Sequence, residues 1–546
     1  MPLSNVEKGS VDFVEDVGVE KSSEDAVLVS ADGEIKLLPV PSKDPNDPLN
    51  FSRYAKLGII VSCCWFSIMS LSVVGGLGSI LTIFIDLYAK EGVDETRVGW
   101  LTTFPSLFIG IGNYFLLPLG LAFGRRLVTL LAITVLLAAT VGCALSQNYE
   151  QHFALRIVQG LATGATESLL PLILAEVTFV HQRGKIYGLY WSTQNIINSC
   201  FNIASSYEAA ALGWRWYYWI FVITIAIGGL ITFFTCFETA YHRSAQIIDG
   251  RVVFTDEYGV TRVLKGEEAQ AYIVANSSAE SQGDRIPEEM IHKKTYLELL
   301  KPWSGIKNPP LKTIRDAWWS MLLCLTSPGI LYATLLSSAV LAAAIGMGLT
   351  YDTVLQDYGW EAKNVGLINL GGVFGSFGGL LYGGIFGDWF TVRLAKRSGG
   401  VHTPEHRILL LVPPGIITVF TLLLYGFTAG GGSTWGAPYM AWAIFEVAFV
   451  AVLIISTTFA AEAWDNNAGP ALVVVVGSKN LVSFGISYAL IPMVAKYSYA
   501  AGMGMLAGVT AFIFLLGIPV YYLNPKWRRW MAEKVELKAK STSTST

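Results

Sequence analysis

Long apolar stretches recur between Lys56 and Leu523, and short polar connectors separate most of them. A membrane-spanning helix needs about 20 mostly apolar residues, because the hydrocarbon core of a bilayer is roughly 30 Å thick. Twelve stretches meet this requirement, at 57–83, 98–118, 127–146, 153–177, 186–208, 217–236, 321–347, 364–387, 407–428, 438–459, 471–494 and 502–523. The pattern predicts an all-α membrane protein with twelve transmembrane helices.

A polar insert at 238–320 divides these stretches into two groups of six. The predicted order is a disordered tail (1–55), a six-helix bundle (56–237), the central loop (238–320), a second bundle (321–523) and a C-terminal tail (524–546). Two six-helix pseudo-repeats are typical of transporters whose halves rock around a site near the middle of the membrane.

The composition agrees with burial in lipid and argues against other classes. Hydrophobic residues make up 53% of the chain and charged residues 14%, against about 25% charged residues in ordinary soluble domains. The net charge of −3 and the lack of a basic stripe argue against a nucleic-acid partner. The six cysteines form no CxxC pair, and the sequence contains no GxxxxGK[ST]. We therefore expect no metal, no cofactor and no ATP-driven pump.

The distribution of Lys and Arg among the connectors predicts the orientation, because cytosolic connectors carry the excess of positive charge. One set of connectors holds Arg125, Arg126, Arg183, Lys185, Arg393, Lys396, Arg397 and Arg407, and the other set holds Lys90, Arg97, Arg215, Lys363 and Lys496. The first set is predicted to be cytosolic, and with it both termini and the central loop.

Four motifs carry a resemblance to a known family. They are DPNDPLNFS (44–52), PLGLAFGRR (118–126), RIVQG (156–160) with the following FVHQRGK (179–185), and GDWFTVRLAKRSGGVHTPEHR (387–407). With them the chain resembles a major facilitator superfamily transporter, most of all the fungal branch related to twelve-span drug:proton antiporters. The resemblance implies the major facilitator fold, a small-molecule substrate, protons as coupling ions, and a monomer in the plasma membrane.

The two basic connectors are candidate gates. Gly124 permits a tight turn, and the arginines beside it can reach helix-end carbonyls or a carboxylate such as Glu176. The predicted gate residues are Gly124, Arg125, Arg126, Glu176, Arg183, Asp388, Arg393, Arg397, Glu405 and Arg407. The alternative is that these positive charges only determine topology.

The chain departs from the family pattern in two places. The acidic position of the first loop falls on Leu121 and the arginine after it on Ala122, so Asp388 is expected to carry more of the gate. Span five has a run of amides in 188–210 where antiporters have a Gly-Pro motif associated with proton exchange. This second departure weakens the case for export by antiport and makes import or facilitated exchange more credible.

Ionisable groups inside transmembrane helices are costly and are functional candidates by default. Arg156, Gln159 and Glu167 lie in span four, Glu446 in span ten, and Lys479 and Asn480 in span eleven. Opposite charges from the two halves can neutralise one another across a cavity, or one of them can meet a charged substrate. The alternative is a fixed polar contact between helices. Asp86, Glu208 and Glu462 lie near span ends and are expected to be interfacial.

Span five also carries a polar stripe. Asn195, Asn198 and Asn202 are spaced i, i+3 and i+7, which places them on one helical face. Such a stripe can bind a polar substrate or pair helices. Tyr190, Trp191 and Trp442 are deep aromatic residues that can pack on a ring or an organic cation.

Three functions compete at this stage. The leading one is secondary active transport of a drug, metabolite or organic ion by alternating access, coupled to protons. The second is a transporter-like nutrient or metabolite sensor that signals through its loop or tails. The third, a membrane-bound enzyme, finds no catalytic constellation in the sequence. Acidic residues favour a cationic substrate, Arg156 and Lys479 favour an anion, and the choice stays open.

Overall fold

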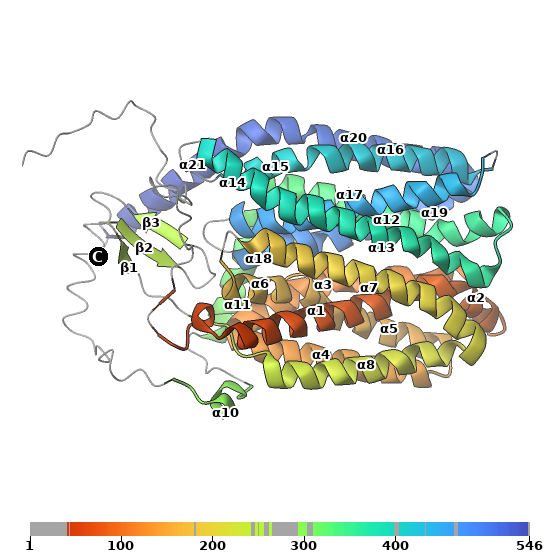
Figure 1. Ribbon diagram of the computed structural model, residues 1–546, viewed down its shortest axis with the longest axis horizontal. Helices are drawn as coiled ribbons and strands as arrows, with labels where there is room; N and C mark the ends of the chain where they lie inside the picture. The colour runs from red at the N-terminus through yellow and green to blue at the C-terminus, as the bar shows by residue number, and fades with distance from the viewer. Residues whose placement is uncertain are drawn as a thin grey trace, which may run out of the picture.

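The computed structural model describes residues 41–42, 44–179, 182–241, 246–248, 251–255, 261–264, 293–302, 309–397, 403–431, 433–463 and 468–543. Most of the predicted N-terminal tail and of the central loop lies outside these residues. Long helices run side by side through the described part of the chain (Figure 1).

The first half holds helices α1 to α8. Side chains of Ser52, Asp94 and Asn148 cap α1, α3 and α5, and each satisfies a backbone N–H that the helix leaves unpaired. The elements are η1 (Pro48–Asn50), α1 (Arg53–Gly75), η2 (Gly76–Ile80), α2 (Leu81–Ala89), α3 (Glu95–Phe123), α4 (Arg125–Leu145), α5 (Tyr149–Thr163), η3 (Gly164–Thr166), α6 (Leu169–Val177), α7 (Arg183–Leu212) and α8 (Trp214–Thr235).

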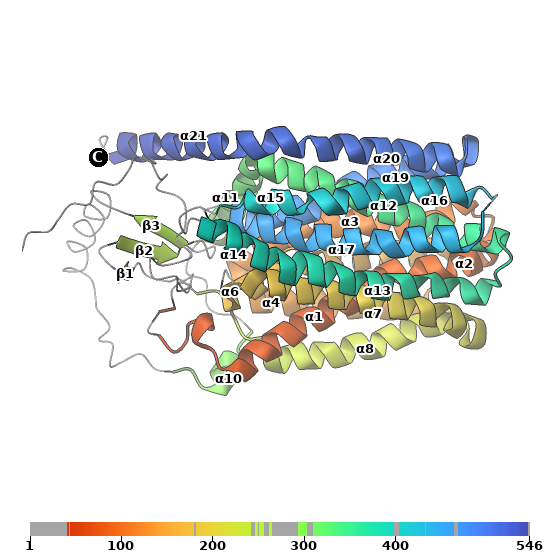
Figure 2. The same cartoon turned by 45° about the horizontal axis from the view of Figure 1, so that its top comes forward.

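The second half holds helices α12 to α21 and two π-helical turns, η7 and η8. Its elements are α12 (Pro328–Asp357), η6 (Ala362–Ile368), α13 (Asn369–Gly379), η7 (Leu380–Phe386), α14 (Gly387–Arg397), α15 (His406–Leu410), α16 (Val412–Ala429), α17 (Gly436–Ala463), α18 (Ala468–Leu472), η8 (Val473–Gly477), α19 (Ser478–Lys496), α20 (Tyr499–Leu515) and α21 (Gly517–Ser543). Helix α21 extends past the rest of the bundle (Figure 2).

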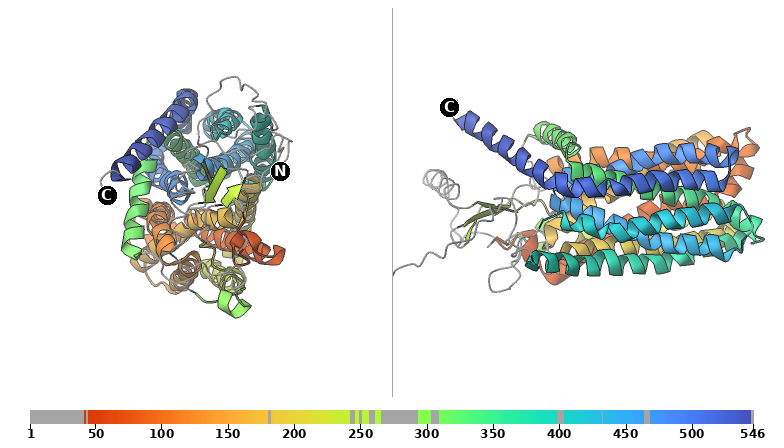
Figure 3. Two further views of the ribbon diagram at one scale, coloured as in Figure 1. Left: turned by 90° about the vertical axis from the view of Figure 1, so that its left-hand side faces the viewer. Right: turned by 90° about the horizontal axis from the view of Figure 1, so that it is seen from above.

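Between the halves lies structure that the sequence did not predict. Strands β1 (Gln246–Ile248), β2 (Arg251–Thr255) and β3 (Thr261–Leu264) form an antiparallel sheet in the order β1-β2-β3. Two helices follow, α10 (Tyr296–Leu299) and α11 (Pro310–Cys324). Helix α11 lies at the edge of the bundle beside α3, where the indole of Trp318 donates to the carbonyl of Tyr114 (Figure 3).

The predicted twelve-span layout agrees closely with the structure, although several span bounds differ. Eleven helical segments of the described chain are long and apolar enough to cross a membrane. Helix α7 is the twelfth: its 30 residues span about 45 Å at 1.5 Å per residue, and its amides lower its hydropathy. The span predicted at 321–347 begins at Pro328, because 321–324 belong to α11. The span predicted to end at 387 continues through Arg397, so Asp388 lies in a helix and not in a loop.

The bundle has two distinct ends. The strand end holds β1–β3, the turn between α3 and α4, and the start of α7, whereas the opposite end holds α2 and the start of α3 (Figure 1). At the strand end Gly124 has φ +106°, a conformation that only glycine adopts readily. Helices α3 and α4 can therefore reverse direction across a single residue.

Candidate functional site

A cavity of about 260 Å³ lies between the two halves. Helices α1, α3 and α7 line it from the first half, and α12, α13, α17 and α19 from the second. Its lining reaches from Glu167 and Lys479 toward the opposite end as far as Gly75, which is exposed.

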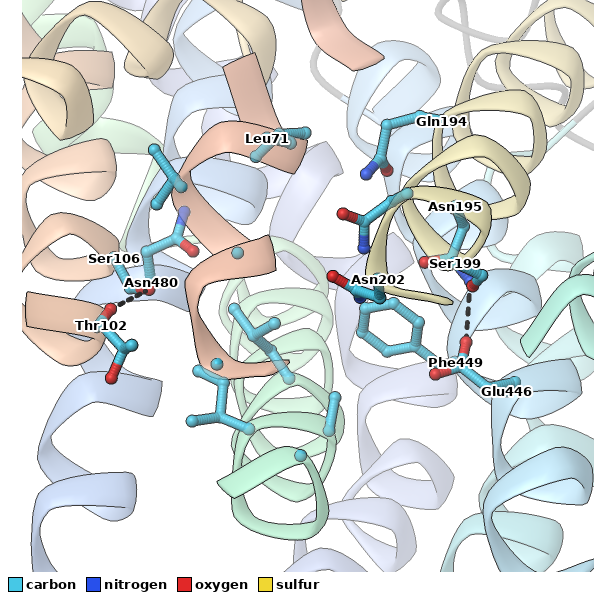
Figure 4. Close-up of a pocket in the computed structure, with 18 of the residues that line it drawn as sticks. Leu71, Thr102, Ser106, Gln194, Asn195, Ser199, Asn202, Glu446, Phe449 and Asn480 are labelled. Atoms are coloured by element: carbon cyan, nitrogen blue, oxygen red, sulfur yellow. Dashed lines mark hydrogen bonds between the residues drawn. The ribbon is translucent and has the colours of Figure 1, made fainter. Parts of the chain in front are cut away.

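The polar side of the cavity is the amide stripe of α7, which we define as Gln194, Asn195, Asn198 and Asn202. All four line the cavity, and three of them, Asn195, Asn198 and Asn202, are the residues predicted to share one helical face. Figure 4 shows Asn195 turned toward Glu446 of α17 and Gln194 and Asn202 turned into the space between the halves. The amide of Asn195 donates to Glu446 Oε2 at 2.7 Å and to Ser376 Oγ at 2.8 Å. This amide therefore links the two halves.

Glycines of α13 place Glu446 on the cavity. A Cβ added at Gly375 would lie 2.6 Å from the Cβ of Glu446, and one at Gly372 would lie 2.7 Å from Ser199 Oγ. Only glycine permits so close an approach of α13 to α17 and α7. Glu446 is 5% exposed, and no basic side chain among the described residues forms an ion pair with it.

The floor of the cavity is an ion pair across the halves. Glu167 of the first half accepts from Lys479 and Asn480 of α19 and from Asn113 of α3 at 3.3 Å. The chain leaves regular α-helix at both partners, at η3 before Glu167 and at the π-helical η8 before Lys479. Such π-helical turns are frequent at functional sites, because they shift the direction of the side chains that follow.

Aromatic side chains complete the floor. The indole of Trp191 lines the cavity and donates to Thr457 Oγ1 in the other half at 3.1 Å, and the ammonium of Lys479 lies 5.7 Å from its ring. Tyr190 does not line the cavity. Its hydroxyl donates to the carbonyl of Thr166, which stabilises the η3 turn.

Arg156 and Gln159 also lie outside the lining, contrary to their predicted place in the pathway. The guanidinium of Arg156 is fully buried and donates to the carbonyls of Leu101, Val73 and Val74 at 2.7–2.9 Å and to Gln159 Oε1 at 3.0 Å. Arg156 therefore satisfies the unpaired carbonyls at the end of α1 and joins α1, α3 and α5.

At the strand end, Asp388 links the two halves. Its Oδ2 accepts from the backbone N–H of Lys185, in the first turn of α7, at 3.0 Å, and its Oδ1 lies 3.4 Å from Arg407. Arg407 also forms a two-bond ion pair with Glu462 at 2.6 and 2.7 Å. Glu462, predicted to be interfacial, is in fact a buried member of this cluster.

The charges of the first connector, in contrast, contact one another within the first half. Arg125 pairs with Glu176 at 2.8 Å, and Glu238 accepts from the backbone N–H groups of Arg125 and Arg126. The side chain of Arg126 donates to carbonyls of Phe233, Cys236 and Leu300. This cluster fastens α4 and α6 to the chain after α8.

The other predicted gate residues have separate places. Arg183 reaches the carbonyl of Ala461 in the other half at 3.5 Å. Glu405 accepts from Asn524 and, through two bonds of 3.0 Å, from Arg528, which fastens α21 to the bundle. Arg393 lies over the ring of Trp389, and Arg397 is exposed.

Twelve membrane-length helices in two halves around one shared cavity define a secondary transporter. The chain belongs to the Major Facilitator Superfamily, whose family model matches residues 62–485. It is therefore a membrane transporter and not an enzyme, and the predicted resemblance to this family is confirmed.

The sequence relatives include fungal proteins, several of them named as transporters. An uncharacterized MFS-type transporter of Schizosaccharomyces pombe is 24% identical, over 94% of this chain and 91% of its own length. Protein HOL1 of Saccharomyces cerevisiae is 22% identical, over 92% of each chain. The efflux pump radE of Floropilus chiversii is 24% identical, over 84% of this chain and 81% of its own length. The human organic anion transporter MFSD10 shares the fold, with a TM-score of 0.54, 13% identity, and coverage of 86% of this chain and all of its own.

Proposed function

We propose that this protein moves a small organic solute across the membrane by alternating access, with the strand end in the cytosol of a plasma-membrane protein. The observation that supports this proposal most directly is the ion pair between Glu167 and Lys479. It joins the two halves and lies between the cavity and the strand end. A solute that enters from the opposite end passes only when this pair and the Asp388 contact separate.

Proton coupling follows from the cost of separating this pair. Side-chain exposures of 4% for Glu167 and 3% for Lys479 mean that separation leaves two buried charges unpaired, which costs several kcal/mol. A proton taken up by Glu167 removes one of those charges. The proposed cycle therefore includes protonation of Glu167 when the strand end opens, despite the missing Gly-Pro motif in span five.

A flux assay tests transport directly. Purified protein is reconstituted into liposomes loaded with a mixture of organic amines, organic acids and neutral solutes, and the loss of each is followed by mass spectrometry. We expect selective loss of at least one solute, faster with a pH gradient than without. Binding of a solute without any flux would favour the alternative function, a sensor built on a transporter fold.

A further inference from the structure

The cavity holds one carboxylate whose charge the described protein does not balance. Lys479 is the only basic side chain in the described lining, and Glu167 already occupies it. Among the described residues, Glu446 accepts a hydrogen bond from the neutral amide of Asn195. A buried carboxylate without a cation is expensive, so the cavity favours a positively charged occupant.

Aromatic side chains line the same cavity as this carboxylate. Trp442 lies one helical turn before Glu446 on α17, and the rings of Trp442 and Tyr351 are 5.6 Å apart. Phe449, which is labelled in Figure 4, and Tyr351 also line the cavity. Aromatic faces attract organic cations, with Trp the strongest.

Two polar atoms beside Glu446 have no hydrogen-bond partner in the described structure. They are the indole N–H of Trp442, whose residue is 6% exposed, and Oδ1 of Asn198. A buried polar atom without a partner costs about 1–3 kcal/mol. An occupant with a hydroxyl group can accept from the indole and donate to the amide oxygen.

The opposite end of the bundle, from which the solute is proposed to enter, carries an excess of negative charge, which attracts cations. The described side chains at the opposite end include the acidic residues Asp86, Glu91, Asp94, Glu150, Glu208, Asp352, Asp357 and Glu361, against the basic residues Lys90, Arg97, Arg215, Lys363 and Lys496. Arg97 and Lys363 are also paired, with Glu150 and Glu361. An acidic entrance to a confined cavity raises the local concentration of cations.

From these four observations we propose, on the basis of the transport function above, that the substrate is a small organic cation with an apolar or aromatic body and a hydroxyl group. Its ammonium group binds Glu446, its body packs against Trp442, Tyr351 and Phe449, and its hydroxyl meets the free indole N–H and Asn198.

Three matched probes separate charge from shape. All three probes have the same phenyl ring and hydroxyl group. 2-Amino-1-phenylethanol is a cation, 1-phenylethanol lacks the amino group, and mandelate has a carboxylate in place of the aminomethyl group. Binding of radiolabelled 2-amino-1-phenylethanol is measured on the full-length protein in nanodiscs. We expect saturable binding that the unlabelled amine displaces and that neither 1-phenylethanol nor mandelate displaces.

Two variants locate the charge contact. Glu446→Gln keeps the size and the bond to Asn195 but loses the charge, and we expect at least roughly tenfold weaker amine binding, the equivalent of one charge-assisted hydrogen bond. Asp316→Asn is the matched control, since the Asp316 side chain is exposed and lies outside both the lining and the acidic entrance; the affinity of this variant should stay within about twofold of wild type, as for other exposed pairs.

Several outcomes would overturn the cation assignment. Equal amine affinity in Glu446→Gln would reduce Glu446 to a proton site, and displacement by mandelate would indicate an anion transporter. Flux of acids without flux of amines in the liposome assay would refute the cation while transport stands. Amine binding without flux of any solute would instead refute transport and leave the binding site in place.

Discussion

Gly184 of the first half and Asp388 of the second half are in direct contact: a Cβ added at Gly184 would lie 1.9 Å from Asp388 Oδ1. Glycine is therefore required where α7 meets α14. Because Arg407 holds Asp388 in place, the carboxylate cannot move aside without losing its partner.

Gly184→Ala should open the strand end. In a Cys200→Ser background, which removes an exposed thiol, an Asn198→Cys reporter in the cavity should react faster with an impermeant maleimide from the strand side. We expect a rate increase of about tenfold, for a conformational shift near 1.4 kcal/mol. Gly508→Ala is the control, since its Cβ would meet nothing within 4 Å. Equal labelling rates would show that this contact does not close the cavity.

Asp388→Asn should lower the transport rate more than it lowers expression. An asparagine oxygen can still accept from Lys185, but the charge that faces Arg407 is lost, and a charged hydrogen bond contributes about 1.5–3 kcal/mol. Flux per molecule should fall about tenfold or more. Asp316→Asn, at an exposed pair with Arg315, is the control. Normal flux at normal abundance would leave Asp388 a topology determinant only.

Glu167→Gln should uncouple transport from protons. The amide mimics a protonated carboxyl, so the variant should lose accumulation driven by a pH gradient yet keep part of its exchange at equal pH. Flux in both regimes is measured in the same liposomes. Accumulation equal to wild type would exclude Glu167 as the coupling site, and complete loss of binding would make it a substrate ligand.

Asn276 tests the orientation. The sequence NSSA (276–279) is a formal acceptor for N-glycosylation, and it lies outside the described residues, in the central loop predicted to be cytosolic. We expect no shift in gel mobility on glycosidase treatment after expression in a eukaryotic host. A glycan on Asn276 would reverse the orientation, and a control acceptor inserted after Gly431 should be glycosylated.

The spans were predictable because each depends on a local run of apolar residues, and the amide stripe because its spacing is local too. Pairing was harder. The sequence indicated that charges of the two halves can meet, but Glu167 and Lys479 are 312 residues apart, and nothing local selects that pair over Arg156 with Glu446. Arg156 looked like a pathway residue because its partners are backbone carbonyls, which every sequence contains. Asn113 and Glu238 were missed, and Glu462 was assigned to the interface, for a similar reason, since their partners come from distant segments.

If the solute enters the cavity from the opposite end, as proposed, the shape of the cavity also determines across which part of the protein the membrane voltage falls. Space that is open to the opposite end shares that compartment's electrical potential, so the voltage falls mainly across the packed layer between Lys479 and Asp388. A unit charge that crosses this layer changes energy by about 2.3 kcal/mol per 100 mV. For the proposed cationic substrate we therefore expect entry as far as Glu446 to be nearly independent of voltage, and the proposed opening of the strand end to be the electrogenic step.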